Sequence, residues 1–189
     1  MLTRLTTLLL IALAATACSG GAAGSFSASG PAGSGLTVPT ASTLPPSGTV
    51  KLADGIIYTV AAPGTTLRLD NLTLRILSVA WRKHISVAVE PPGTSIFAQF
   101  TVRITNGTTD TATVGATQIW LRNPLNHTFL AAATAQVPKQ LIGASLAPGQ
   151  ATTGTLVFPL PGKQQGGLLV YRFGDTPASA KHVGVARFT

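Results

Sequence analysis

The stretch from residue 96 to residue 106 constrains the fold more than any other part of the chain. It reads I-F-A-Q-F-T-V-R-I-T-N and runs into Asn106-Gly107, a dipeptide that favours a turn. The even positions from Ile96 to Ile104 are apolar, and four odd positions are polar: Gln99, Thr101, Arg103 and Thr105. Apolar residues at alternate positions form one buried face of a β-strand, whose other face meets water. The stretch therefore predicts a strand in a sheet with a single core side.

Shorter runs of the same kind recur between turn residues from residue 51 onward. They span residues 56–60, 65–69, 72–81, 112–114, 118–122, 128–130, 151–160, 168–173 and 183–188. The apolar positions change parity between residues 76 and 77, which predicts a β-bulge. Residues 134–146 have the best chance of forming a helical turn or a loop. We expect seven to nine short strands in an all-β, antiparallel immunoglobulin-like β-sandwich, with a β-barrel as the alternative.

Residues 1–17 have the pattern of a lipoprotein signal peptide. Arg4 precedes an apolar run that is shorter than the roughly 18–20 residues a bilayer core requires. Cys18 is the only cysteine, and the small residues before it, Ala15-Thr16-Ala17, resemble the bacterial lipobox. That resemblance implies cleavage before Cys18 and lipid on both its thiol and its new amino group. Plain secretion with an unmodified cysteine is the alternative.

Residues 18–50 are predicted to be the lipidated cysteine and a flexible tether. No charged residue occurs from Ser19 to Val50; Ser, Gly and Ala dominate the first part, and Pro and Thr become frequent in the second. Such a composition gives a coil with a reach of about 30 Å, stiffened where proline is frequent. We expect the folded domain to occupy residues 51–189.

Basic residues outnumber acidic ones, with 13 Lys and Arg against 5 Asp and Glu and a net charge of +8. This excess favours anionic partners such as envelope polymers or lipid headgroups. The densest basic cluster, Arg82-Lys83-His84, is only a tripeptide, so an ordinary solvated surface is the alternative. We expect no nucleic-acid partner.

The sequence contains no pattern of catalytic or metal-binding residues. It has no G-x-S-x-G motif, and its carboxylates are far apart in the chain: Asp54, Asp70, Glu90, Asp110 and Asp175. The three histidines lack the close spacing of metal ligands, and neither Cys nor Met occurs after residue 18. We therefore expect no enzyme, no catalytic residue, no metal and no cofactor.

Two pairs of aromatic and basic residues form the candidate ligand patch. Trp81 is followed by Arg82, and Trp120 shares one face of a short predicted strand with Arg122. Exposed Trp and Arg are typical of recognition surfaces for a sugar or a peptide. Tryptophan is also usually largely buried, so placement in the core is the alternative.

Two motifs in the predicted domain resemble a known family. The first is Phe100-Thr101-Val102-Arg103-Ile104-Thr105-Asn106-Gly107, and the second, from Leu146 to Phe158, reads L-x-P-G-x-x-x-x-G-x-L-x-F. Together they resemble the telokin-like, immunoglobulin-like extracellular domain of bacterial lipoproteins, related to the mycobacterial immunoprotective secreted antigen. The resemblance spans about residues 65–188. It implies a β-sandwich and brings no catalytic residues, because its motifs are features of strands and turns.

These features together give an expected location and role. We expect a lipid-anchored protein on the outer face of the cytoplasmic membrane or the cell surface, with secretion as the alternative. Its sandwich is expected to be a non-enzymatic binding module, whose partners are the membrane, through the lipid, and another envelope protein or an anionic envelope polymer. The alternatives are an accessory protein or enzyme acting on envelope polysaccharide, and a spacer with no specific ligand.

Overall fold

The computed structural model describes residues 39–172 and 181–189. The predicted signal peptide, Cys18 and residues 19–38 of the predicted tether lie outside these residues, as does Phe173 at the end of a predicted strand. The described residues form twelve strands and one short 3-10 turn, η1 (Ala116–Gln118). The strands are β1 (Gly48–Lys51), β2 (Ile57–Ala61), β3 (Thr66–Leu69), β4 (Leu72–Arg82), β5 (Ile96–Asn106), β6 (Ala112–Gly115), β7 (Ile119–Arg122), β8 (Thr128–Leu130), β9 (Gly143–Leu146), β10 (Ala151–Leu160), β11 (Gly167–Tyr171) and β12 (His182–Phe188).

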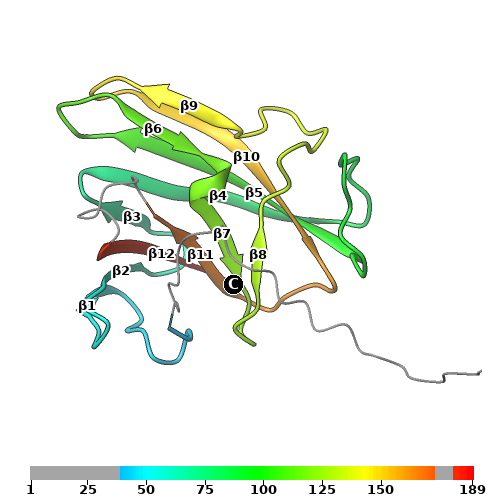
Figure 1. The fold of residues 1–189 in the computed structure, drawn as a ribbon, viewed down its shortest axis with the longest axis horizontal. Helices are drawn as coiled ribbons and strands as arrows, with labels where there is room; N and C mark the ends of the chain where they lie inside the picture. Colours follow the sequence, from blue (N-terminus) through cyan, green and yellow to red (C-terminus); the bar gives the residue numbers. More distant parts are fainter. Residues whose placement is uncertain (1–38, 173–180) are drawn as a thin grey trace, which may run out of the picture.

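Two sheets face each other and form a β-sandwich (Figure 1). One sheet has six strands in the order β1-β2-β12-β11-β7-β8, and the other has four in the order β10-β5-β4-β3. The order β12-β11-β7 matches strands G, F and C of an immunoglobulin domain, and β4-β5-β10 matches strands A, B and E. The predicted fold class is confirmed. One pairing departs from the antiparallel expectation, because β2 runs parallel to β12.

The central strand is β5, and its even positions face the core as predicted. Ala98, Phe100, Val102 and Ile104 are fully buried, and Ile96 packs at the edge of the same cluster. The Phe100 ring meets the edges of two other rings, with centroids 5.6 Å from Phe158 and 4.9 Å from Phe188. Because Phe158 belongs to the four-stranded sheet and Phe188 to the six-stranded sheet, Phe100 ties the two layers together.

The predicted bulge is present in β4. The register between β4 and β5 shifts between Ile76 and Ser78, which leaves Leu77 as the extra residue. Val79 and Trp81 resume inward packing beyond the bulge, as the change of parity predicts. Leu77 itself was expected to share their face but is 47% exposed, because the bulged residue has no position in the ladder.

The twelve strands exceed the expected seven to nine because several short ones lie at the periphery. Residues 134–146 contain no helix; they form a loop that ends in β9, which pairs with β6. Figure 1 shows the β6–β9 ribbon beside β10, at one end of the sandwich. Its buried residues Ala112, Val114 and Leu146 belong to the main core, so this ribbon closes the core at that end.

Asn106 turns the chain through its side chain. Its amide nitrogen donates to the carbonyls of Asp110 and Leu146, at 2.7 and 2.8 Å, and its amide oxygen accepts from the Thr108 N–H. The backbone at Asn106-Gly107 has no positive φ, so the side-chain bonds of Asn106, and not a left-handed backbone, stabilise the turn. Gly107 is required because a Cβ would lie 2.5 Å from the Asn71 carbonyl oxygen.

The folded unit begins before the predicted boundary at residue 51. β1 pairs with β2, and Leu44 is 5% exposed. Arg187 of β12 fixes the same segment, since its guanidinium donates to the carbonyls of Ala41, Leu44 and Pro45 at 2.8, 3.0 and 3.1 Å. We call residues 41–56 the N-terminal cover. Its strand β1 forms the edge of the six-stranded sheet, and its apolar side chains pack on the outer-face cluster that contains Val183 and Val185.

Candidate functional site

Trp81 and Arg82 leave the end of β4 in opposite directions. Trp81 stands opposite Ala98 on the inner side and is only partly buried against the main core. Arg82 stands opposite Phe97 on the outer side and is exposed. Because side chains alternate along a strand, these neighbours cannot contribute to one compact site.

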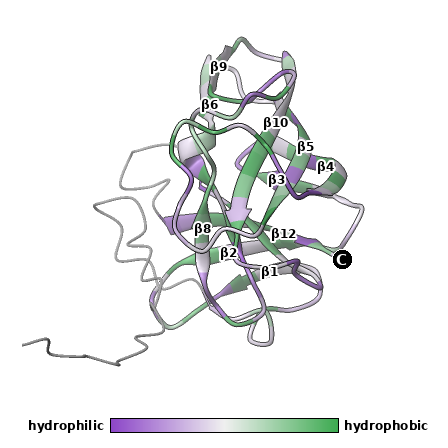
Figure 2. Cartoon of the chain, turned by 90° about the vertical axis from the view of Figure 1, so that its right-hand side faces the viewer, coloured by the Kyte–Doolittle hydropathy of each residue, from purple (hydrophilic) through white to green (hydrophobic). Residues whose placement is uncertain are grey.

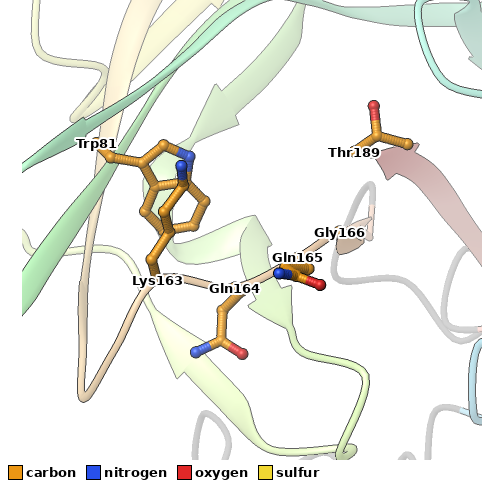
Figure 3. A pocket seen from close by; sticks show the side chains of 6 residues that line it. All are labelled: Trp81, Lys163, Gln164, Gln165, Gly166 and Thr189. Carbon is orange, nitrogen blue, oxygen red and sulfur yellow. The ribbon is translucent and has the colours of Figure 1, made fainter.

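A hollow of about 420 Å³ opens beside Trp81 (Figure 3). We call it the Trp81 hollow; it is lined by Trp81, Lys163, Gln164, Gln165, Gly166 and Thr189. The Lys163 ammonium lies 6.0 Å from the centroid of the Trp81 ring, at the outer limit of a cation–π contact. Figure 3 shows Lys163 and the two glutamines on one loop segment beside the ring.

The loop between β10 and β11 places these polar residues. The Gln164 amide nitrogen donates to the Gly162 carbonyl at 2.7 Å, and the Gln164 amide oxygen accepts from the Asn123 side chain at 3.3 Å. Gly166 has a φ of 78°, a conformation that side-chain-bearing residues rarely adopt. Gln164 is therefore fixed by the fold, whereas Gln165 is exposed.

Trp120 and Arg122 lie elsewhere, on the outer face of the six-stranded sheet. Both are 7% exposed, and Trp120 packs with Val60, Val170 and other residues beneath the N-terminal cover. Burial lowers the pKa of the Arg122 guanidinium, and the nearby Tyr58 acts in the opposite direction. In this arrangement the two residues offer little surface to a ligand.

Tyr58 is the other titratable group beneath the cover. Burial, reinforced by the charge of Asp54, raises its pKa to about 12. Its hydroxyl donates to the Asp54 carboxylate over a long 3.5 Å, and that carboxylate also accepts from the Ile56 N–H at 2.9 Å. These contacts hold the turn between β1 and β2 against the sheet.

The four residues of the predicted patch therefore occupy separate places, and Trp81 is the one that lines the Trp81 hollow. Their role in ligand binding stays a prediction. Sequence reasoning did not assign Lys163, Gln164 and Gln165 to the site. Their polar run between turn residues was visible, but no sequence signal places it beside a tryptophan 82 residues earlier.

Two further hollows carry different chemistry. One of about 500 Å³ is lined by Lys51, Asp54, Gly55, Ile57, Lys181 and His182. His182 Nδ1 lies 2.7 Å from the Asp70 carboxylate, and both side chains are more than a third exposed. The other, of about 330 Å³, lies between the loop after β4 and the loop before β9.

Within residues 39–172 and 181–189, no group of three or more His, Cys, Asp or Glu is placed to hold a metal ion. The same residues contain no helix that is long and apolar enough to span a membrane.

Comparisons with solved structures find similarity to several bacterial proteins. The chain resembles a candidate lipoprotein of Bacillus subtilis, YcdA, with 13% identity and a TM-score of 0.56 over 68% of this chain and 39% of YcdA. It resembles YjhA of Bacillus subtilis with 17% identity and a TM-score of 0.53 over 67% of this chain and 98% of YjhA. A secreted protein of Mycobacterium tuberculosis, MPT63, matches with 15% identity and a TM-score of 0.45 over 66% of this chain and 95% of MPT63.

At these identities the comparisons concern the fold, and the predicted family resemblance is confirmed at that level. The descriptions of these three proteins name no enzymatic activity. No curated protein matches the sequence. A family model, however, matches residues 62–183, which is more than half of the chain and spans β3 to the start of β12. The chain therefore belongs to the family defined by the domain of unknown function DUF4352.

Proposed function

We propose that this protein is an extracytoplasmic lipoprotein whose β-sandwich binds a saccharide in the Trp81 hollow without catalysing a reaction. Lipid on Cys18 holds it on the outer face of the cytoplasmic membrane, and residues 19–38 link the lipid to the domain. The observation that carries the proposal is a partly exposed indole ring beside side-chain amides and an ammonium group.

The chemistry of the lining fits a sugar ring. The flat face of an indole packs against the C–H groups of a pyranose, and amides and ammonium groups hydrogen-bond to its hydroxyls. Trp81, Gln165 and Lys163 supply these three kinds of contact. A few polar groups around an apolar surface are the usual composition of a small-molecule site.

The lining residues also favour binding over hydrolysis. Glycoside hydrolysis generally uses a pair of Asp or Glu residues on opposite sides of the scissile bond. None of the six residues that line the hollow is Asp or Glu. This lining supports the proposal of a site that binds a sugar without cleaving it.

The sequence features of the N-terminus support the anchored location. A short apolar run precedes small residues and a single cysteine, and an unmodified exposed thiol would be reactive in an oxidising compartment. The similarity of the fold to a candidate lipoprotein agrees with this assignment. Two or three acyl chains give stable anchoring, because each buried methylene group contributes about 0.8 kcal/mol.

Tryptophan fluorescence tests the saccharide site directly. Of the two tryptophans, Trp120 is 7% exposed and Trp81 is partly exposed, so a ligand in the hollow should protect mainly Trp81 from acrylamide quenching. We expect titration of the full chain with envelope-derived oligosaccharides to reduce quenching. Isothermal titration calorimetry, which does not need Trp81 as a reporter, should show that Trp81→Ala abolishes binding. Leu77→Ala, an exposed apolar change on the same strand, is the matched control. Unchanged affinity in Trp81→Ala would rule out this site.

Fractionation of cells tests the anchor separately. We expect the wild-type chain in the membrane fraction and Cys18→Ala in the soluble fraction. A Cys18→Ala variant that stays with the membrane would contradict lipid anchoring, whatever the outcome of the sugar titration.

A further inference from the structure

Three arginines stand on the outer face of the four-stranded sheet. Arg68 of β3, Arg75 of β4 and Arg103 of β5 are all exposed, and each alternates with buried core residues. Figure 2 shows the resulting alternation of hydrophilic and hydrophobic positions along these strands. We call Arg68, Arg75 and Arg103 the arginine face.

The register places two of these positive charges directly opposite each other. Arg75 pairs with Arg103 across β4 and β5, and Arg68 is a diagonal neighbour of Arg75, two residues from its partner Thr66. Opposed residues on antiparallel strands have Cα atoms only about 4.5–5.5 Å apart, and like charges in such pairs repel. This arrangement is unfavourable for the isolated domain.

Nothing among the described residues neutralises the three charges. β3, β4, β5 and β10 contain no Asp or Glu. The only ion pair found among residues 39–172 and 181–189 joins His182 to Asp70, and none of the three guanidinium groups makes a hydrogen bond there. Within residues 39–172 and 181–189, the arginine face is thus a cluster of positive charge with no paired carboxylate.

The residue types on this face point to a specific class of anion. The four strands carry four of the eight arginines in the chain and none of its five lysines. Guanidinium groups bind phosphate and carboxylate in a bidentate manner, whereas lysine acts as a point charge. Hydroxyl donors surround the arginines, because Thr66, Thr73 and Thr153 are their cross-strand partners.

The position of the N-terminal cover favours an extracellular polymer over lipid headgroups as the source of phosphate. Arg187 holds residues 41–45 on the outer face of the six-stranded sheet, on the opposite side of the sandwich from the arginine face. Because the chain toward Cys18 leaves on that side, the arginine face stays clear of the tether and open to a polymer outside the membrane. This step rests on the anchoring proposed above.

We propose that the arginine face docks onto an extracellular polymer with repeating phosphodiester groups. A phosphodiester carries its charge throughout the physiological pH range, and successive phosphates on one chain can engage neighbouring guanidinium groups. Bound phosphates neutralise the three guanidinium groups and so relieve the electrostatic repulsion between them. The face is separate from the Trp81 hollow, so the protein can hold the polymer and a saccharide at once.

Salt-dependent binding to poly(glycerol phosphate) tests the proposal with the full-length protein in neutral detergent micelles. We expect the triple variant R68Q/R75Q/R103Q to lose at least ~10-fold in affinity. Each phosphate contact on a flexible polyanion adds about 0.7 to the slope of log affinity against log salt, so the slope should fall by about 2. The matched control K51Q/K139Q/K181Q removes the same charge from exposed positions elsewhere and should change affinity less than ~3-fold.

Two outcomes of this experiment would contradict the proposal. Equal losses in the two triple variants would indicate attraction to net charge alone. Binding to vesicles that contain phosphatidylglycerol, with no binding to the polymer, would assign the face to lipid. If the triple variant does not fold, R103Q alone should still lower the slope by about 0.7. Trp81→Ala should leave polymer affinity unchanged, so this test and the saccharide test fail independently.

Discussion

On the outer face of the six-stranded sheet, residues 41–56 cover a second apolar cluster; on the outer face of the four-stranded sheet, the arginine face is open to water. The covered cluster includes Tyr58, Trp120 and Val170, each at most 7% exposed. The open face has only arginine, threonine and other small or polar side chains around Arg103. The six-stranded sheet is therefore buried on both sides, whereas the four-stranded sheet is buried on its inner side and only partly covered on its outer side.

Arginine has a different role on each face. Arg187 lies beneath the N-terminal cover, and its guanidinium donates hydrogen bonds to three backbone carbonyls of that cover. Arg75 and Arg103 repel each other in the open. The comparison shows that the residue type alone does not set how many hydrogen bonds an arginine makes. Arg187 makes three because a distant segment of the chain packs over it, whereas no segment among the described residues covers Arg75 or Arg103.

The four-stranded sheet itself is divided. Beyond the arginine face, Phe97 and Val157 also point outward, and they are buried by the loops after β4 and before β9 with Ala135. Arg82 marks the edge of this covered half, opposite Phe97. Cover by loops thus decides which part of one continuous sheet face remains available to a partner.

Trp120→Ala gives the largest expected effect and tests whether the cover is a packed core. Removing a buried tryptophan should lower the free energy of unfolding by ~3–5 kcal/mol, measured by denaturant titration. Leu77→Ala, at an exposed position, should change it by less than ~0.5 kcal/mol. A cost under ~1 kcal/mol for Trp120→Ala would mean that the two faces do not differ in packing.

Arg187→Met tests the attachment of the cover. The substitution retains much of the apolar stem but loses the charged donors, so we expect a loss of ~1.5–3 kcal/mol in unfolding free energy. Amide hydrogen exchange in residues 41–45 should also become faster. Arg103→Met on the open face should not lower stability, and relief of the repulsion with Arg75 should raise it by up to ~1 kcal/mol. Equal effects of the two substitutions would remove the distinction drawn above.

Alkaline pH should weaken the covered face through Tyr58. The pKa of Tyr58 is about 12 in the folded protein and 10 when unfolded, so between these values only the unfolded chain loses the proton. Stability should be full below pH 10 and should fall as pH rises to 12, by up to ~1.4 kcal/mol for each pH unit.

The matched variant for this pH dependence is Tyr58→Phe, which should make the decrease shallower. Some slope should remain, because burial also raises the pKa of Tyr171. Chemical denaturation at several pH values measures both slopes. An identical slope in the wild type and in Tyr58→Phe would show that Tyr58 does not titrate with unfolding.

Arg75→Thr gives the smallest expected effect and has the opposite sign. Relief of the repulsion between Arg75 and Arg103 should raise the free energy of unfolding by ~0.2–1 kcal/mol, more at low salt than at high salt. Thermal unfolding in two salt concentrations measures it. A destabilisation that is independent of salt would show that the open face contributes to the fold.

Local pattern was sufficient to predict much of the fold. The alternation in β5, the change of parity in β4 and the turns between runs all follow from the period of a strand and the chemistry of turn residues. The peripheral strands β1 and β9 were missed, because each is only 4 residues long and carries a weak alternating pattern. The residues of the candidate site were predicted less well. Trp81 and Trp120 each lie in a predicted strand near an arginine, and this local pattern does not show which of them is exposed.

The sequence alone determined that the chain is an all-β domain of short strands, because strand period and turn chemistry are properties of neighbouring residues. The tertiary structure decided for the sandwich over the barrel. Only the tertiary structure decided that Trp120 is covered, that Trp81 lies beside Lys163, and that Arg75 faces Arg103. Each of these facts joins segments that are far apart in the chain. Such contacts depend on register and on the path of loops, which no local pattern specifies.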